Sequence, residues 1–310
     1  MMRAIAADRA QLTKIITQEM PASPQFLGVA MLPFVHRPLY VTADGKFLII
    51  SMRLMLDGLY DLAYWRVWEH LKFEHGPQGE ALSQTFTQFY GQILERYVVE
   101  LLRSVYDADG TKRVYAEVEA QPAVGASDAA VFLDDRVLLV EVTKTDLQYF
   151  DTLLTGDLAS FNADFARTAD KALQAAQAEQ RFKSAQVSYA GHEGDTNLPV
   201  ERIVIVPNPI PRFPFINEHT GAALQRVGLP ADTTIISVGE LEEPLVAGDL
   251  KALSKTIEAW QHSELADLAL HNYIRIKKPV IPMGQRAPYV NACAEGLRKL
   301  VIERMAFKKE

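Results

Sequence analysis

Apolar residues recur at three- and four-residue intervals between Thr85 and Tyr106, in the segment TFTQFYGQILERYVVELLRSVY. This spacing places them on one face of an α-helix, so the segment is predicted to be an amphipathic helix. The face is formed by Phe86, Tyr90, Ile93, Leu94, Tyr97, Leu101 and Val105.

The pattern then changes to short runs rich in β-branched residues, which predict strands over 113–120, 127–133 and 137–145. Asp134 and Asp135 separate the last two runs, as expected for a hairpin turn. A long alanine-rich helix is predicted from about Asp157 to Phe182. It is followed by the continuous apolar run IVIV (203–206), which is typical of a strand buried on both sides, and by a short strand over 233–238. A hairpin followed by a helical crossover indicates an α/β fold with a mixed central sheet between helices.

The flanking segments follow a different pattern. Residues 1–85 begin with a short extended segment broken by several prolines. A short strand is then predicted to begin near Lys46 and to run into a helix with Trp65 and Trp68 at helical spacing, so the N-terminal region is predicted to be mostly helical. Residues 241–310 are predicted to be helical as well. The chain is therefore expected to have three parts, with the α/β core at 86–240.

Composition supports a folded protein of about two domains, because the 310 residues are 48% hydrophobic and 23% charged. The only cysteine, Cys293, excludes an intramolecular disulfide and a zinc site made of several thiolates. No run approaches the roughly 18 apolar residues of a membrane span, and the first residues lack the apolar core of a secretory signal. We therefore expect a cytoplasmic protein that has no membrane partner.

Charge is unevenly distributed along the chain. The net charge is −7, yet residues 271–310 contain nine basic and three acidic residues. A basic segment on an acidic chain can face phosphates, which makes Lys277, Lys278, Arg298 and Lys299 candidate nucleic-acid contacts. The same charges can also form an ordinary solvated helix face with a frayed tail, and the sequence leaves that alternative open.

The hairpin brings two acidic residues together. If Asp134 and Asp135 form a two-residue turn, counting back along both strands places Asp128 directly opposite Glu141 on the same face. Two adjacent carboxylates repel each other and need a compensating cation. Because both supply only oxygen ligands, Mg²⁺ or Mn²⁺ is the expected ion.

A third carboxylate can join this pair from the preceding helix. Glu95 lies at the margin of the apolar face, and Gly91, one turn before it, would allow a neighbouring segment to approach closely. Glu100 is instead flanked by Arg96 and Arg103 at salt-bridge spacing, which is typical of a surface residue. Glu95 is therefore expected to point toward Asp128 and Glu141.

These motifs, YGQILERYVVELL and SDAAVFLDDRVLLVEVTK, together resemble the PD-(D/E)XK, or restriction-endonuclease-like, nuclease superfamily over roughly residues 86–240. The resemblance implies an αβββαβ core and cleavage of phosphodiester bonds with bound Mg²⁺ or Mn²⁺. It further implies a metal held by Asp128, Glu141 and the carbonyl of Val142. Glu95 and Lys144 would complete the catalytic set.

One position departs from the family pattern. The family has a lysine two residues after the strand glutamate, where this chain has Thr143, and Lys144 comes one residue later. A bulge after Glu141 could turn Lys144 toward the carboxylates. Alternatively, Lys171 on the following helix could supply the charge, or the site could be degenerate and bind without cutting.

The resemblance therefore implies a metal-dependent endonuclease or exonuclease with DNA as the favoured substrate, and a role in restriction or anti-phage defence would fit it. The alternative is a catalytically degenerate nuclease-like fold that serves as a nucleic-acid-binding or assembly subunit. The expected partners are nucleic acid and either a second copy in a homo-oligomer or a defence-system protein. A different function, in which the strand acids are ordinary surface residues, would require Asp128 and Glu141 to face opposite sides of the sheet.

Overall fold

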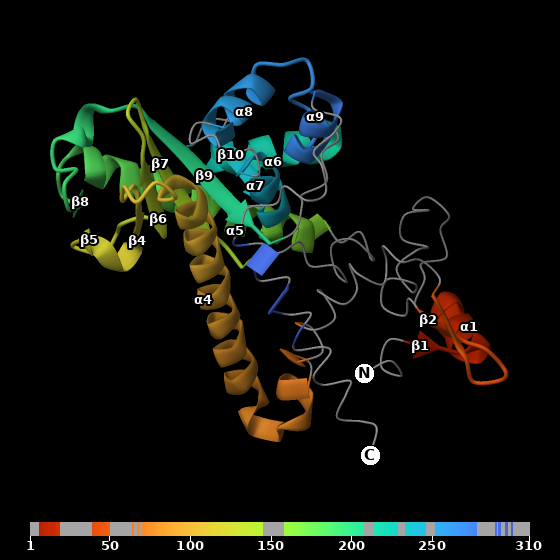
Figure 1. The fold of residues 1–310 in the computed structure, drawn as a ribbon. Coiled ribbons are helices and arrows are strands. Elements are labelled where there is room, and N and C mark those ends of the chain that lie inside the picture. The colour runs from red at the N-terminus through yellow and green to blue at the C-terminus, as the bar shows by residue number, and fades with distance from the viewer. Residues whose placement is uncertain are drawn as a thin grey trace. The chain divides into compact units, whose positions relative to one another are not determined.

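A computed structural model of the chain divides into two compact units, Met1–Tyr90 with Leu147–Phe161 and Gly91–Asp146 with Asn162–Glu310 (Figure 1). The residues described are 6–18, 39–49, 64, 67–68, 70–144, 158–207, 214–228, 233–245, 252–277, 289, 291–292, 295–296 and 299. The boundary expected at residue 85 lies near the division at Tyr90. The boundary expected at residue 240 falls inside a helix, Val238–Leu245, and the second unit contains both sides of it.

The first unit contains a small sheet, of which the sequence predicted the strand that begins near Lys46 but not the other two strands or their pairing. Its strands are in the order β1-β2-β3, with β1 and β2 parallel and β2 and β3 antiparallel. Gly45, with a φ of 78°, allows the tight turn between β2 and β3. Strands β1 and β2 are too short to show a periodicity, so they were not predicted. The described elements are β1 (Ala6–Ala7), α1 (Arg9–Gln18), β2 (Leu39–Val41) and β3 (Phe47–Ile49).

The second unit is built on a five-stranded mixed sheet, as the sequence predicted. The strand order is β10-β9-β7-β6-β4. Strand β6 is antiparallel to both β4 and β7, whereas β9 runs parallel to β7 and β10 runs parallel to β9. The strands are β4 (Val114–Ala116), β6 (Ala129–Phe132), β7 (Val137–Val142), β9 (Val200–Val206) and β10 (Thr234–Ser237). A separate antiparallel pair is formed by β5 (Ala120–Gln121) and β8 (Ser188–Tyr189).

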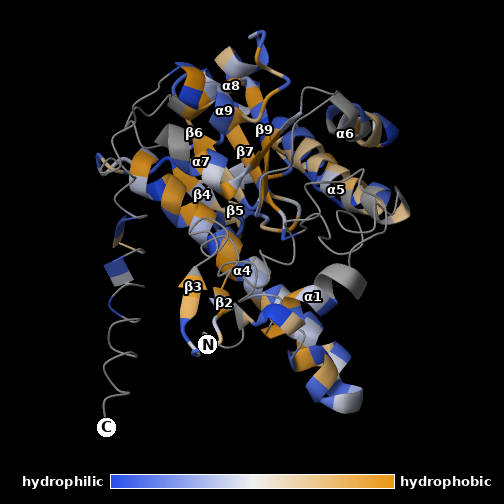
Figure 2. Cartoon of the chain, turned by 90° about the vertical axis from the view of Figure 1, so that its right-hand side faces the viewer, coloured by the Kyte–Doolittle hydropathy of each residue, from blue (hydrophilic) through white to orange (hydrophobic). Residues whose placement is uncertain are grey.

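Helices cover both faces of this sheet. On one face α4, α7, α8 and α9 share a core with the strands, and on the other face Phe182 of α5 packs in a cluster with Tyr115 and Phe132 of the strands. Figure 2 shows the strands as mostly apolar and α5 as alternating between polar and apolar residues. The helices are α4 (Gly79–Tyr106), α5 (Leu158–Lys183), α6 (Pro214–Arg226), α7 (Val238–Leu245), α8 (Ala252–Gln261) and α9 (Leu270–Lys277). Short 3₁₀ turns occur at η3 (Gly76–Gln78), η4 (Glu117–Glu119) and η6 (Asp195–Asn197).

The first predicted strand is shorter than expected. Strand β4 ends at Ala116, and η4 replaces the second half of the predicted 113–120 strand. The carboxylate of Glu119 accepts the backbone N–H of Ala116 at 2.8 Å and pairs with the Arg103 guanidinium at 2.6 Å. These contacts provide the chain with local partners in place of a continued strand ladder.

The hairpin register is as predicted. Phe132 pairs with Val137 and Ala129 with Val140, and the backbone N–H of Leu133 donates to the carbonyl of Arg136 at 2.9 Å. Continuing this register by one residue places Asp128 opposite Glu141. None of the helices in the described residues has the length and apolar character needed to cross a membrane.

Candidate active site

Asp128 and Glu141 lie at the end of the hairpin and are largely buried. Only 4% of the Glu141 side chain and 14% of the Asp128 side chain are exposed. Asp128 Oδ2 accepts the backbone N–H of Val142 at 2.7 Å, which fixes this carboxylate at the edge of strand β7. The two carboxylates are therefore side by side, and not on opposite faces of the sheet.

A single lysine contacts both carboxylates. Lys171 Nζ, on helix α5, lies 3.3 Å from Glu141 Oε2 and 3.5 Å from Asp128 Oδ2. Because side chains alternate along a strand, Glu141 and Leu139 point to the same face, and Leu139 belongs to the cluster that α5 covers. The geometry thus selects Lys171, the second of the three sequence-based alternatives, as the cation beside the carboxylates.

The expected bulge that would turn Lys144 inward is absent. The ladder between β7 and β9 continues regularly through Val142, which pairs with Ile205, and the backbone N–H of Thr143 donates to the Ile205 carbonyl at 2.9 Å. Regular alternation therefore holds, with Thr143 buried and Lys144 exposed. The prediction that Lys144 swings toward Asp128 is wrong, because the strand has no extra residue to reverse its alternation.

The Lys144 side chain instead lies against helix α4 at Gly91. A Cβ atom added at Gly91 would lie 3.3 Å from Lys144 Cδ, which is a tight contact. The glycine one turn before Glu95 therefore does allow a close approach, as expected, and the neighbour is the lysine stem. Lys144 also lowers the pKa of Glu95, although burial and other charges outweigh this effect.

Burial and neighbouring charges shift the pKa values of Glu141 and Lys171. Burial, followed by the charge of Asp128, raises the pKa of Glu141 from its ordinary value to about 8, although Lys171 opposes the shift. Burial lowers the pKa of Lys171, but the charges of Asp128 and Glu141 reverse this effect and raise the pKa overall. Asp128 and Glu141 therefore repel each other, and the Lys171 ammonium group only partly offsets this repulsion.

Two more carboxylates belong to the same electrostatic neighbourhood. Burial and the charge of Asp128 raise the pKa of Glu95, and the same two causes raise the pKa of Glu117. Glu100, by contrast, pairs with Arg103 at 3.0 Å and its side chain is 37% exposed, in agreement with the predicted surface position. Glu95 is therefore electrostatically coupled to Asp128, and the direction of its carboxylate stays a prediction.

Sequence reasoning did not identify Glu117. Its backbone N–H donates to the Asp128 carbonyl at 3.2 Å, so it lies directly beside Asp128 across the β4–β6 edge. The β4–β6 register, in which Ala116 pairs with Ala129, would have placed Glu117 opposite Asp128. No tight turn joins these two strands, so the sequence contains no marker that fixes their register.

The oxygen ligands of this site suit a hard divalent cation. Among the residues that the structure describes, no group of three or more His, Cys, Asp or Glu side chains is placed to hold a metal ion. Mg²⁺ commonly needs only one or two carboxylates and takes its other ligands from water and phosphate. Asp128 and Glu141 meet that requirement. The carbonyl of Val142 is a third oxygen on the Asp128 side of β7, because N–H and C=O of one strand residue point the same way.

The candidate nucleic-acid contacts in the C-terminal region are only partly described. Lys277, at the end of α9, and Lys299 are both exposed. Lys278 and Arg298 lie outside the described residues. The basic surface predicted for residues 271–310 therefore rests on Lys277 and Lys299, together with exposed Arg275.

Comparison of the chain with protein-family models, with curated proteins and with solved structures finds no match in any of the three. The interpretation of the site therefore depends on its residues and their geometry.

The raised pKa of Glu141 predicts a pH-dependent stability in the absence of divalent cations. The folded state holds a proton that the unfolded chain loses between pH 4.5 and about 8, so the free energy of unfolding should fall as pH rises through this window. The contribution of this one group is at most about 1.4 kcal/mol per pH unit. Urea unfolding in EDTA at several pH values would measure it. Glu141→Gln should flatten the slope, whereas equal slopes in the two proteins would contradict the assignment.

Proposed function

We propose that the chain is a metal-dependent phosphodiester hydrolase that acts on nucleic acid, with Asp128, Glu141 and Lys171 as its centre. The observation that carries this proposal is the position of Lys171 Nζ, 3.3 and 3.5 Å from the two carboxylates. Buried carboxylates beside one amine are frequent at catalytic sites, and so are carboxyl groups with a strongly raised pKa, such as Glu141. Burying such charges lowers the stability of a fold.

The order and direction of the surrounding elements support the same interpretation. Helix α4 precedes three antiparallel strands, β4, β6 and β7, and helix α5 then leads to β9, which runs parallel to β7. This is the αβββαβ order expected of a restriction-endonuclease-like core. Asp128 directly precedes the second strand of that order and Glu141 lies in the third, as the resemblance implies.

A divalent cation, when bound, would polarise the scissile phosphate and lower the pKa of a water molecule. Asp128 and Glu141, with the carbonyl of Val142, would hold it. The Lys171 ammonium group lies beside the same carboxylates. Its positive charge would stabilise the negative charge that builds up on the phosphate in the transition state. Glu95 and Glu117 lie at the periphery, and their raised pKa values suit a carboxyl that accepts a hydrogen bond or a proton.

The proposal is tested by incubating the purified protein with supercoiled plasmid, single-stranded DNA and single-stranded RNA. We expect cleavage of at least one substrate in Mg²⁺ or Mn²⁺ and none in EDTA. Plasmid nicking would indicate an endonuclease, whereas loss of label from one end only would indicate an exonuclease. If the protein binds nucleic acid but cuts none of these substrates with either metal, the degenerate-site alternative replaces the proposal.

Nucleic-acid binding by this protein should weaken as salt increases. Each phosphate contact made by a lysine or arginine contributes about −0.9 to the slope of log K against log salt for duplex DNA. Lys277→Ala should make this slope about one unit shallower if the exposed end of α9 contacts phosphate. An unchanged slope would remove α9 from the binding surface and would leave the proposed centre untouched.

A further inference from the structure

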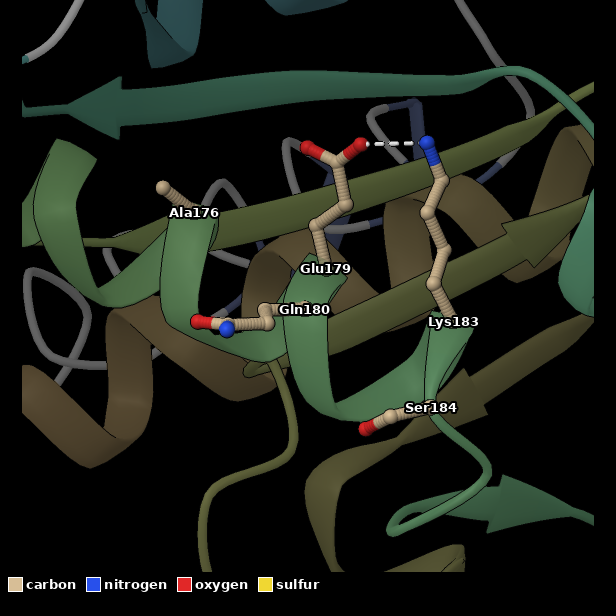
Figure 3. A pocket seen from close by; sticks show the side chains of 5 residues that line it. All are labelled: Ala176, Glu179, Gln180, Lys183 and Ser184. Atoms are coloured by element: carbon tan, nitrogen blue, oxygen red, sulfur yellow. Dashed lines mark ion pairs between the residues drawn. The ribbon is translucent and has the colours of Figure 1, made fainter.

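The end of helix α5 carries two cations with different surroundings. Lys183 Nζ pairs with Glu179 Oε1 at 2.7 Å, and Figure 3 shows this pair among the side chains that line a pocket on α5. Glu179 is also 3.6 Å from Arg202 Nε. Arg181, two residues before Lys183, has no carboxylate within ion-pair distance anywhere in the described chain. Arg181 as a whole is half-buried.

A glycine makes room for this guanidinium. A Cβ atom added at Gly125, in the loop before β6, would lie 1.6 Å from Arg181 Nη1 and 2.6 Å from Arg181 Cζ. Gly125 also has a φ of +85°, which other residues rarely adopt. A side chain at this position would therefore displace the guanidinium, so the loop and the helix together fix where the charge lies.

Arg181 is also one of the residues that line a small polar pocket with a volume of about 270 Å³. None of the described residues in the lining is acidic. The chain turns back at the helix end because Ala185 has a φ of 57° and the backbone N–H of Gln186 donates to the Arg181 carbonyl at 2.8 Å. This turn brings Gln186 back toward α5. The lining residues are Gln177, Gln180, Arg181, Ser184 and Gln186.

We propose that this pocket binds a phosphate group of the nucleic-acid strand that the Asp128–Glu141–Lys171 centre cuts, and this inference rests on the proposed function. A guanidinium binds phosphate through two parallel hydrogen bonds, and amide and hydroxyl groups can donate to the remaining oxygens. Lys171 and Arg181 are ten residues apart on one helix, or about 15 Å. That distance corresponds to roughly four nucleotide steps of a duplex strand, at about 3.4 Å each.

Lys183 offers a matched control for Arg181. Both residues lie in the last turn of α5, where the helix dipole favours a cation whatever else it does. Replacing either residue with alanine removes the same charge from the same helix end. Only Arg181 lines the pocket, whereas Lys183 is held by Glu179.

The test compares the binding of a fluorescent oligonucleotide to wild type, Arg181→Ala, Arg181→Lys and Lys183→Ala, in EDTA so that cleavage cannot occur. We expect Arg181→Ala to weaken binding about tenfold, as for the loss of one charge-assisted hydrogen-bonded contact. Arg181→Lys should recover part of this loss because the charge returns. Lys183→Ala should bind like wild type, and the melting temperatures should show that all variants fold.

Oligonucleotide length provides a second readout. A substrate with fewer than about four nucleotides on one side of the cleaved bond cannot reach Arg181, so wild type and Arg181→Ala should bind it equally. Equal binding of long substrates by these two proteins, or an equal loss in Lys183→Ala, would overturn the inference while leaving the proposed function standing.

If wild type binds no nucleic acid, the proposed function fails, and inorganic phosphate and pyrophosphate then test the pocket alone by calorimetric titration. Binding that is lost in Arg181→Ala and kept in Lys183→Ala would support a phosphate pocket that serves a smaller ligand. No binding of either anion by wild type would overturn the inference.

Discussion

Replacing Lys171 with methionine is expected to slow metal-dependent cleavage by at least about 10²-fold, which is the usual cost of losing one electrostatic stabiliser of a transition state. Lys171 contacts both carboxylates of the centre through its Nζ atom. Methionine keeps the apolar stem and removes only the ammonium group, so packing of α5 on the sheet should be preserved. Single-turnover cleavage rates measured at saturating metal would give the ratio.

Lys144→Met is the matched control for this experiment. It removes the same charge from the lysine that follows the family motif, yet the Lys144 stem lies against Gly91 and not beside Asp128. We expect this variant to cut within a few fold of wild type. If Lys144→Met were instead inactive and Lys171→Met active, the assignment of the two lysines would have to be reversed.

Two substitutions at Asp128 should separate its structural role from its chemical role. Asp128→Asn retains an oxygen that can accept the Val142 N–H, whereas Asp128→Ala leaves that largely buried amide unpaired. We expect Asp128→Ala to lose about 1–3 kcal/mol of stability and Asp128→Asn to lose less. Both variants should lose cleavage by at least about 10³-fold, because neither supplies a negatively charged oxygen to a cation.

Chemical unfolding and cleavage assays on the same preparations would check this expectation. An Asp128→Asn protein that is stably folded and inactive would place the defect in the chemistry. If Asp128→Asn cut at the rate of wild type, Asp128 would have only the structural role of holding strand β7.

The sequence was sufficient to predict a mixed sheet, because runs of β-branched residues mark its strands and the Asp134–Asp135 turn fixes the hairpin register. The observed pairing of Ala129 with Val140 follows directly from that turn. In the small N-terminal sheet the sequence predicted only the strand that became β3. Strands β1 and β2 have two and three residues and no periodicity to detect.

Contacts of the site between residues close together in the sequence could be predicted, whereas contacts between distant residues could not. Asp128 and Glu141 are joined by one tight hairpin, so counting residues placed them together. Lys171 reaches them from a helix 30 residues beyond Glu141, and only the packing of α5 on the sheet determines which of its side chains arrives there. The sequence named Lys171 as a candidate but favoured Lys144, since nearness along the chain outweighed the regular alternation of the strand.

Glu117 and Arg181 illustrate the same limit. Glu117 depends on the β4–β6 register, which no short turn specifies. Arg181 depends on the loop around Gly125, whose contact with α5 joins residues 56 positions apart. Neither relation has a period or a motif in the sequence, so both emerge only from the folded chain.

The central claim is that Asp128, Glu141 and Lys171 form a centre that hydrolyses phosphodiester bonds, and Glu141→Gln tests it most directly. Glutamine keeps the shape of the buried side chain and cannot ionise. Cleavage of an end-labelled oligonucleotide should be compared in Mg²⁺, in Mn²⁺ and in EDTA. We expect wild type to cut only with metal and Glu141→Gln to bind the substrate without cutting it. Equal cleavage by the two proteins, or no cleavage by wild type with either metal, would contradict the claim.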